Sequence, residues 1–143
     1  MGVCPVSLGI MDATERSQGV TAAVGIGTDI VEIDRLERSL QRERFAEGVF
    51  GDREQAYCQA RARPAQHYAA RFAAKEAFLK ALGLGVFSGV ALRDIEVVRE
   101  GDEAPRLELG PTAARALEAA GCSRVLVTLS HAGNLACAFV VVQ

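Results

Sequence analysis

Four charged side chains fall within ten residues of one predicted helix. The segment RFAAKEAFLKALG, residues 71–83, carries Arg71, Lys75, Glu76 and Lys80. At helical spacing, Arg71 and Lys75 lie among the apolar residues and alanines line another side, so the helix has no clean solvated face. One carboxylate beside three cations suits a site for a metal ion and phosphate groups, because carboxylates bind hard cations and Lys and Arg bind phosphate oxygens. The alternative is that Glu76 and Lys80, one turn apart, form an ordinary surface ion pair.

Asp29 lies in a second stretch that could do chemistry, GIGTD at residues 25–29. An acidic side chain among Gly, Val and Ile is costly to bury unless a cation or hydrogen-bond donors meet it. Asp29 is therefore a candidate cation ligand, and the alternative is that it caps a helix that begins near Glu32. The glycines are not a dinucleotide-binding motif, because the third glycine is absent and no long βαβ unit follows.

Other polar residues have both a structural and a functional interpretation. Ser130 and His131 end an apolar strand, where a His more often makes a structural hydrogen bond, and no G-x-S-x-G motif surrounds the serine. His67 receives the structural interpretation. Four arginines follow Asp29 in and after the next predicted helix: Arg35, Arg38, Arg42 and Arg44. They form either a solvated face or a docking patch for an acidic partner.

The order of the predicted elements indicates the fold class. Alternation predicts a strand at 24–30, with β-branched residues on one side and glycines and Asp29 on the other. Helical spacing predicts a short helix next, a helical stretch that ends before Pro64, and a long helix at about 67–82. Two hairpins, LRDIEVVRE with RLELG and RVLVTLS with LACAFVVV, flank a helix at 111–120. Hairpins favour an α+β fold, with an antiparallel sheet packed with helices.

Composition limits the class of protein. Half of the 143 residues are apolar, which suits one globular domain with a real core. The net charge of −2 argues against a nucleic-acid partner. Four scattered cysteines without CxxC spacing argue against a zinc site or disulfide framework and favour reduced thiols in the cytoplasm. Residues 1–23 lack the pattern of a signal peptide or membrane span, so we expect a loose N-terminal extension before a domain at 24–143.

Three segments carry a resemblance to a known family. They are GIGTDIVEIDR near the start, RFAAKEAFLKALG in the middle and LSHAGNLACAFVVV at the end. In this order and at these separations they resemble the holo-acyl-carrier-protein synthases, the small phosphopantetheinyl transferases. The likeness runs from about residue 24 to residue 143 and includes DIEVV. Each motif is weak alone, and the three together are a strong signal.

The resemblance implies an activity and the residues that perform it. The family transfers the 4′-phosphopantetheine of coenzyme A to a serine of an apo acyl carrier protein and releases adenosine 3′,5′-bisphosphate. By motif, Asp29 and Glu76 would bind Mg²⁺ and Lys80 would contact the diphosphate of coenzyme A, which makes these three the expected catalytic residues. Arg71, Ser130 and His131 are the other residues expected at coenzyme A.

The resemblance also implies partners. Arg35 matches the basic residue that docks the acidic carrier, and Arg42 is expected to join it. Family members are commonly homotrimers with active sites between subunits, so a homotrimer is expected here. Attack by serine needs a proton acceptor. Glu76 or a water held by the metal could serve, and both stay open.

The sequence departs from the family at a few positions. Gly48 and Gly51 stand where a basic residue and a Thr or Ser are usual, Leu92 replaces an aromatic residue, and a turn that usually carries Lys reads GDEAP at 101–105. None of these is a proposed metal or phosphate ligand. Two competing hypotheses remain: a non-catalytic coenzyme A-binding module, and an interaction domain whose charges are buried ion pairs. The partner of Lys75 is also open, either an acid in the core or a phosphate.

Overall fold

The computed structural model describes residues 25–143. The predicted extension at 1–23 therefore lies outside the described residues and stays a prediction, as does the domain boundary at 24. The elements in chain order are β1 (Gly25–Glu32), α1 (Ile33–Leu40), α2 (Phe45–Val49), α3 (Asp52–Gln59), α4 (Pro64–Ala81), a 3₁₀ turn η2 (Leu92–Asp94), β2 (Ile95–Val98), β3 (Arg106–Leu109), α5 (Pro111–Ala119), β4 (Val125–Ala132) and β5 (Leu135–Val142). None of the helices within this range is long and apolar enough to cross a membrane.

The strands form two antiparallel sheets. One is three-stranded, in the order β1-β5-β4, and the other is the two-stranded β2–β3 hairpin. Both predicted hairpins are confirmed, and so is the α+β class. The turn between β4 and β5 contains Gly133 at a φ of 57°, a left-handed conformation that glycine adopts without steric strain.

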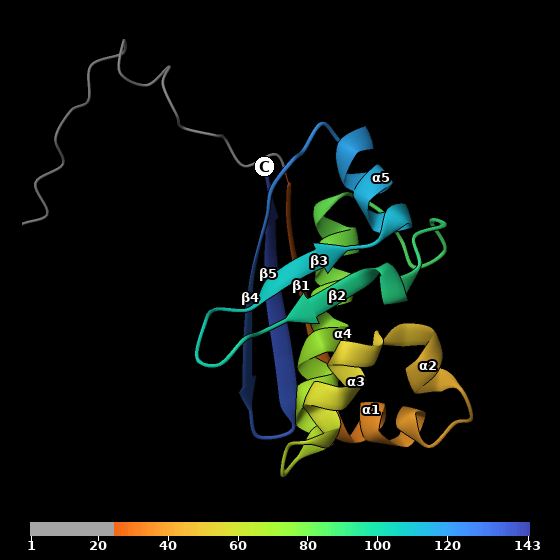
Figure 1. The fold of residues 1–143 in the computed structure, drawn as a ribbon, viewed down its shortest axis with the longest axis vertical. Coiled ribbons are helices and arrows are strands. Elements are labelled where there is room, and N and C mark those ends of the chain that lie inside the picture. The colour runs from red at the N-terminus through yellow and green to blue at the C-terminus, as the bar shows by residue number, and fades with distance from the viewer. Residues whose placement is uncertain (1–24) are drawn as a thin grey trace, which may run out of the picture.

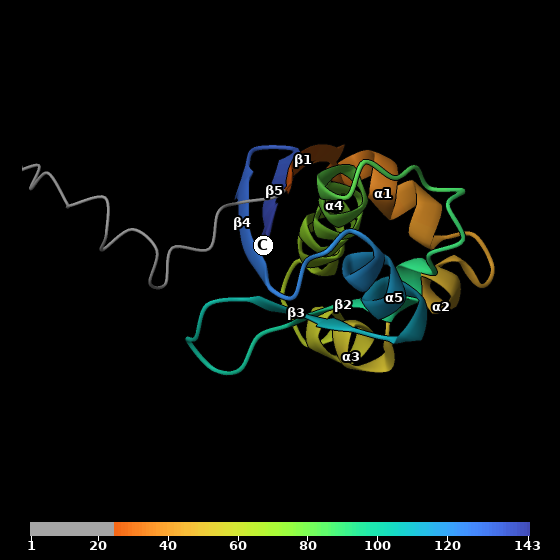
Figure 2. The ribbon, with the colours of Figure 1, turned by 90° about the horizontal axis from the view of Figure 1, so that it is seen from above.

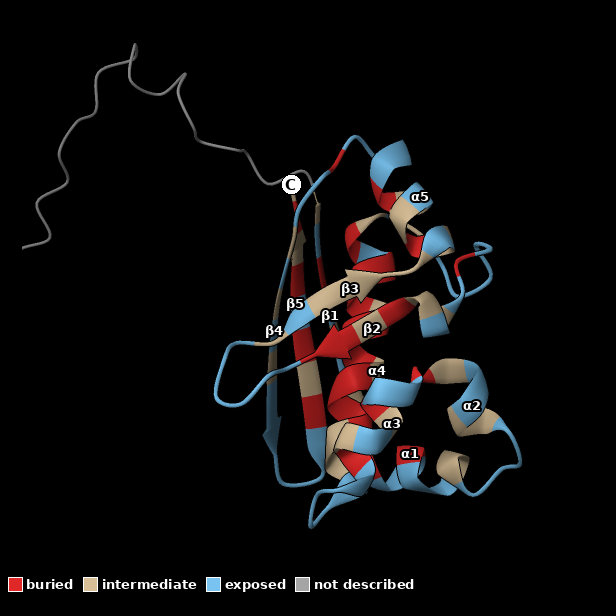
Figure 3. Ribbon diagram, viewed as in Figure 1, coloured by how far each residue is buried: buried red, intermediate tan, exposed pale blue. Residues whose placement is uncertain are grey.

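The long helix α4 lies at the centre of the fold. Figures 1 and 2 show it between the three-stranded sheet on one side and α3 with the β2–β3 hairpin on another. It begins at Pro64, three residues before the predicted start, because proline is well suited to the first turn of a helix. It ends at Ala81, and Gly83 follows at a φ of 68°. Burial on nearly all sides explains why this helix has no solvated face (Figure 3).

Two glycines let β1 pack directly on the backbone of α4. A Cβ at Gly25 would lie 1.9 Å from the carbonyl oxygen of Ala81, and a Cβ at Gly27 would lie 2.0 Å from that of Ala77. Real Cβ atoms do not approach backbone so closely. The alanine side of α4 and the glycines of β1 are therefore complementary, and together they fix Asp29 against the helix.

The other side of β1 is apolar and faces outward. Ile26 is 62% exposed and Ile30 is 65% exposed, and Leu126 on β4 and Phe139 on β5 are exposed as well. The alternation predicted for β1 is thus present, with its glycines and Asp29 toward α4. The exposed apolar side chains therefore lie on three neighbouring strands of one sheet.

Candidate functional site

Asp29 and Lys80 form an ion pair between β1 and the last turn of α4. The Lys80 Nζ lies 2.8 Å from Asp29 Oδ1 and also donates a hydrogen bond to the carbonyl oxygen of Thr28, at 3.1 Å. Among residues 25–143, the ion-pair partner of Lys80 is Asp29 and not Glu76. The interpretation of Glu76 and Lys80 as a simple surface pair is therefore wrong.

Asp29 does not cap the helix that follows it. Helix α1 begins after Glu32, and its first backbone N–H groups are bound by Asn134 from the turn between β4 and β5. Asn134 accepts from Ile33 N through its carbonyl oxygen, at 2.8 Å, and from Asp34 N through Oδ1, at 3.1 Å. The helix-cap alternative for Asp29 is therefore wrong, and its carboxylate is directed to the groove beside α4.

Glu76 lines the same groove as Asp29. Burial raises the pKa of the Glu76 carboxyl above its ordinary value, the negative charge of Asp29 raises it further, and the Lys80 ammonium partly offsets both. Two carboxylates that repel each other in a partly buried groove are stabilised by a cation between them. The arrangement therefore fits a divalent metal ion, and the cation paired with Asp29 is Lys80.

The protein supplies only part of a metal shell here. Within the described part of the chain, no cluster of three or more His, Cys, Asp or Glu side chains could hold a metal. Mg²⁺ is commonly bound by one or two carboxylates together with water and substrate phosphates. Asp29 and Glu76 fit that mode of binding, in which water and the phosphates of a substrate would complete the shell.

The groove has a volume of about 480 Å³ and mixed walls. Arg35 and Ser39 of α1 line it, and its apolar lining residues include Leu36, Phe45, Phe72 and Leu135. Arg42 lies in the turn after α1 and does not line the groove. The structure thus brings Arg35 to the predicted metal site and does not place Arg42 in its lining.

Arg71, Ser130 and His131 line a second pocket of about 290 Å³. Arg71 is only 3% exposed, and its guanidinium carbon lies 4.0 Å from the centroid of the Tyr57 ring. Its NH1 group donates weakly to the His67 carbonyl oxygen at 3.4 Å, and its Nε has no partner within the described residues. The Arg71 Nε therefore remains available to a water or a ligand.

The two pockets lie at opposite edges of the three-stranded sheet. Asp29 belongs to β1 at one edge, His131 belongs to β4 at the other, and β5 runs between them. Their described linings have no residue in common. Glu76 and Arg71 also point to different sides of α4, because they are five residues apart. The predicted site residues are therefore divided into two groups within one chain.

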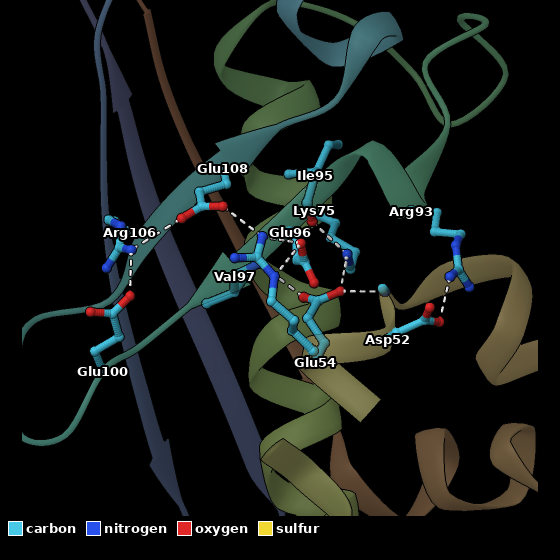
Figure 4. A network of polar contacts seen from close by, with 12 residues as sticks. Asp52, Glu54, Lys75, Arg93, Ile95, Glu96, Val97, Glu100, Arg106 and Glu108 are labelled. Carbon is cyan, nitrogen blue, oxygen red and sulfur yellow. Dashed lines mark hydrogen bonds and ion pairs between the residues drawn. The ribbon is translucent and has the colours of Figure 1, made fainter. Parts of the chain in front are cut away.

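Lys75 is part of the core. It is fully buried, and its ammonium lies 2.7 Å from Glu54 Oε2 and 3.0 Å from the carbonyl oxygen of Leu92 (Figure 4). The same carboxylate accepts from the backbone N–H groups of Gly51, at 2.9 Å, and Val97, at 3.0 Å. Of the two alternatives for Lys75, the acid in the core is confirmed.

Glu54 was not singled out from the sequence. It lies 21 residues before Lys75, in a different helix, and only the packing of α3 on α4 brings the two together. The pair joins α3, α4 and β2, and Lys75 directly precedes Glu76 in α4. Neither Glu54 nor Lys75 lines either pocket.

Comparison with known proteins identifies the family. A sequence profile described as the 4′-phosphopantetheinyl transferase superfamily matches residues 25–140. The chain belongs to the 4′-phosphopantetheinyl transferase superfamily. Over 121 residues it is 47% identical to the holo-[acyl-carrier-protein] synthase of Geobacter metallireducens, an alignment that covers 83% of this chain and 96% of that protein. The resemblance stated from the motifs is confirmed.

Solved structures agree with this assignment. The crystal structure of the holo-[acyl-carrier-protein] synthase from Neisseria meningitidis matches with a TM-score of 0.76 and 35% identity, covering 85% of this chain and 99% of that one. The Helicobacter pylori synthase in complex with coenzyme A matches with a TM-score of 0.72 and 29% identity, covering 82% and 99%. The superfamily fold is therefore established for residues that contain both pockets.

Proposed function

We propose that this protein transfers the 4′-phosphopantetheine of coenzyme A to a serine of an apo acyl carrier protein. The observation that carries the proposal is that Asp29 and Glu76 line one groove and that Lys80 is hydrogen-bonded to Asp29. Relatives that carry the name of this activity are as much as 47% identical to the chain, and one solved neighbour holds coenzyme A. The products are the holo carrier and adenosine 3′,5′-bisphosphate.

The groove residues have distinct roles in this reaction. Asp29 and Glu76 would hold Mg²⁺, which neutralises charge on the diphosphate of coenzyme A as the serine oxygen attacks the β-phosphorus. Lys80 leaves Asp29 and binds a diphosphate oxygen, so its positive charge supports the leaving nucleotide. The half-exposed position of the Lys80 ammonium leaves it free to make this exchange.

The second pocket would bind the nucleotide end of coenzyme A. Arg71 supplies positive charge, and the His131 ring and the Ser130 hydroxyl, both on β4, supply hydrogen-bonding groups. Because this pocket and the groove lie at opposite sheet edges, one complete active site would need the β1 edge of one copy and the β4 edge of the next. Head-to-tail contacts of this kind close into rings.

We propose the ring to be a homotrimer, which is the assembly that the family resemblance implies. The exposed apolar residues Ile26, Ile30, Leu126 and Phe139 would be buried inside it. Mixing two inactive variants, Glu76→Gln and His131→Ala, tests the arrangement. Shared sites predict that the mixture regains activity after subunit exchange, whereas sites contained in one chain predict that it stays inactive.

The carrier protein would dock on α1. Arg35 lines the groove at the reaction centre and Arg42 extends the basic surface, which suits an acidic carrier. Gly48 in α2 has no neighbour within 4 Å of a Cβ position, so packing does not explain why the usual basic residue is replaced by glycine there. The free thiols of Cys58, Cys122 and Cys137 support a cytoplasmic setting.

Glu76→Gln tests the proposal against the non-catalytic alternative. The variant keeps the size of the side chain, so we expect an unchanged circular dichroism spectrum and loss of transfer by roughly two orders of magnitude or more. A fully active Glu76→Gln protein would refute the metal assignment. Binding of coenzyme A by the wild type without any transfer to apo carriers would instead favour the non-catalytic coenzyme A-binding module.

A further inference from the structure

The pocket at the β4 edge is strongly basic. Besides Arg71 and His131, it is lined by His67 and Arg99, and none of its lining residues, all within residues 25–143, is acidic. Arg99 follows β2, so the charge comes from α4, from β4 and from the hairpin β2–β3. Two guanidinium groups from separate elements, Arg71 and Arg99, that line one pocket without an acid suit an anion from outside the chain.

Two arginines of this region, Arg61 and Arg71, pack against the ring of Tyr57. The guanidinium carbons of Arg61 and Arg71 lie 4.1 and 4.0 Å from the centroid of the same Tyr57 ring. The pKa of His67 is lowered below its ordinary value, by burial first and then by Arg71, Arg61, His131 and Arg99. His67 therefore responds to the same positive field, and Arg99 contributes to it.

Arg99 differs from the other arginines that lie at the β2–β3 hairpin. Arg53 of α3 binds Glu96 and Glu108. Arg106 of β3 binds Glu100 at 2.9 Å and Glu108 at 3.0 Å (Figure 4). Arg99 makes no ion pair or hydrogen bond with any residue from 25 to 143. The turn GDEAP at 101–105 has no basic residue of its own.

We propose that Arg99 is a specificity-determining residue that, with Arg71 and His131, binds a phosphate monoester on the nucleotide end of coenzyme A. This inference rests on the proposed function. A monoester carries close to two negative charges at neutral pH and three acceptor oxygens, which matches a set of donors from three elements. A guanidinium binds two of these oxygens at once. Arg99 thus makes the protein prefer the 3′-phosphorylated cofactor over its dephosphorylated form.

Calorimetry on two nucleotides tests this proposal. Arg99→Gln should weaken binding of adenosine 3′,5′-bisphosphate about tenfold, the effect of one charge-assisted hydrogen bond, and leave binding of adenosine 5′-monophosphate unchanged. The matched control is Arg106→Gln, on the same hairpin, whose charge Glu100 and Glu108 already neutralise. It should change neither affinity. Equal weakening of both nucleotides by Arg99→Gln, or no weakening, would overturn the proposal.

Turnover separates this proposal from the proposed function. Arg99→Gln should raise KM for coenzyme A about tenfold, leave KM for 3′-dephospho-coenzyme A unchanged, and keep kcat near the wild-type value. If the wild-type protein is active and Arg99→Gln has the same KM for coenzyme A, the role of Arg99 is overturned and the proposed function is not. If the wild-type protein binds adenosine 3′,5′-bisphosphate but does not transfer phosphopantetheine, the proposed function is refuted. The calorimetric comparison would then still test the role of Arg99 in the pocket. No binding of the bisphosphate by the wild type would overturn the pocket assignment.

Discussion

The ammonium nitrogen of Lys80 lies 2.8 Å from a carboxylate oxygen of Asp29, in the groove that Glu76 also lines. Lys80 is about half exposed and Asp29 is largely buried. The buried carboxylate therefore has a counter-ion that reaches it from solvent. We expect a divalent metal bound by Asp29 and Glu76 to replace that counter-ion, which would make Lys80 available to a phosphate.

Lys80→Gln should separate metal binding from catalysis. Removing the competing cation should strengthen Mn²⁺ binding about fivefold, measured by electron paramagnetic resonance without coenzyme A. Transfer should fall by roughly a hundredfold, because the diphosphate loses a charged donor. Lys80→Arg, which keeps the charge, is the control and should not strengthen Mn²⁺ binding. Weaker or equal Mn²⁺ binding by Lys80→Gln would contradict the account of this pair.

Arg35→Ala should weaken use of the carrier and not of coenzyme A. Arg35 lies on the groove wall contributed by α1, so its loss should raise KM for an acidic carrier about three- to tenfold at low salt, with kcat little changed. Arg124→Ala, at an exposed residue just before β4, is the matched control and should have no effect. Equal increases in KM for carrier and coenzyme A would exclude a docking role.

Lys75→Met should destabilise the fold strongly. It leaves Glu54 buried without a counter-ion, and breaking such a pair costs about 3–5 kcal/mol. The measurement is urea unfolding at fixed protein concentration. The double variant Glu54→Gln with Lys75→Met removes both charges and should be less destabilised than Lys75→Met alone. If the double variant is instead less stable to urea than Lys75→Met alone, the charge of Glu54 must be stabilised by groups other than Lys75.

Gly27→Ala should force β1 away from α4. Its Cβ would lie 2.0 Å from the Ala77 carbonyl oxygen, so we expect a loss of about 1–3 kcal/mol or more in unfolding free energy. Gly48→Ala is the control, because a Cβ there meets nothing within 4 Å. That change should be neutral or stabilise α2 by about 0.5–1 kcal/mol. Similar stability of the two variants would refute the close contact between β1 and α4.

The sequence predicted the groove residues because they lie in motifs. Two short segments contain Asp29, Glu76 and Lys80 at fixed positions. Binding a metal ion and phosphate restricts the residue types that can occupy those positions. The two hairpins followed from alternation and turn residues. Lys75 was recognised as anomalous from its place on the helix wheel, but the wheel carries no information on a partner in another helix.

Other features depend on tertiary packing that local patterns do not encode. Alternation in β1 separates two faces and does not say which one α4 covers, so the outward position of Ile26 and Ile30 was not predicted. The division of Arg71 and His131 from Asp29 follows from the strand order β1-β5-β4. Arg99 is an ordinary exposed arginine in the sequence, and only the fold places it at a pocket with Arg71.

Intact-mass measurement of a carrier protein tests the central claim most directly. The wild-type protein is incubated with its cognate apo acyl carrier protein, coenzyme A and Mg²⁺, with a sample lacking Mg²⁺ as control. The account predicts that the carrier gains the mass of one phosphopantetheine group, that adenosine 3′,5′-bisphosphate is released in equal amount, and that both depend on Mg²⁺. A panel of apo carriers that includes the cognate one and stays unmodified would contradict it.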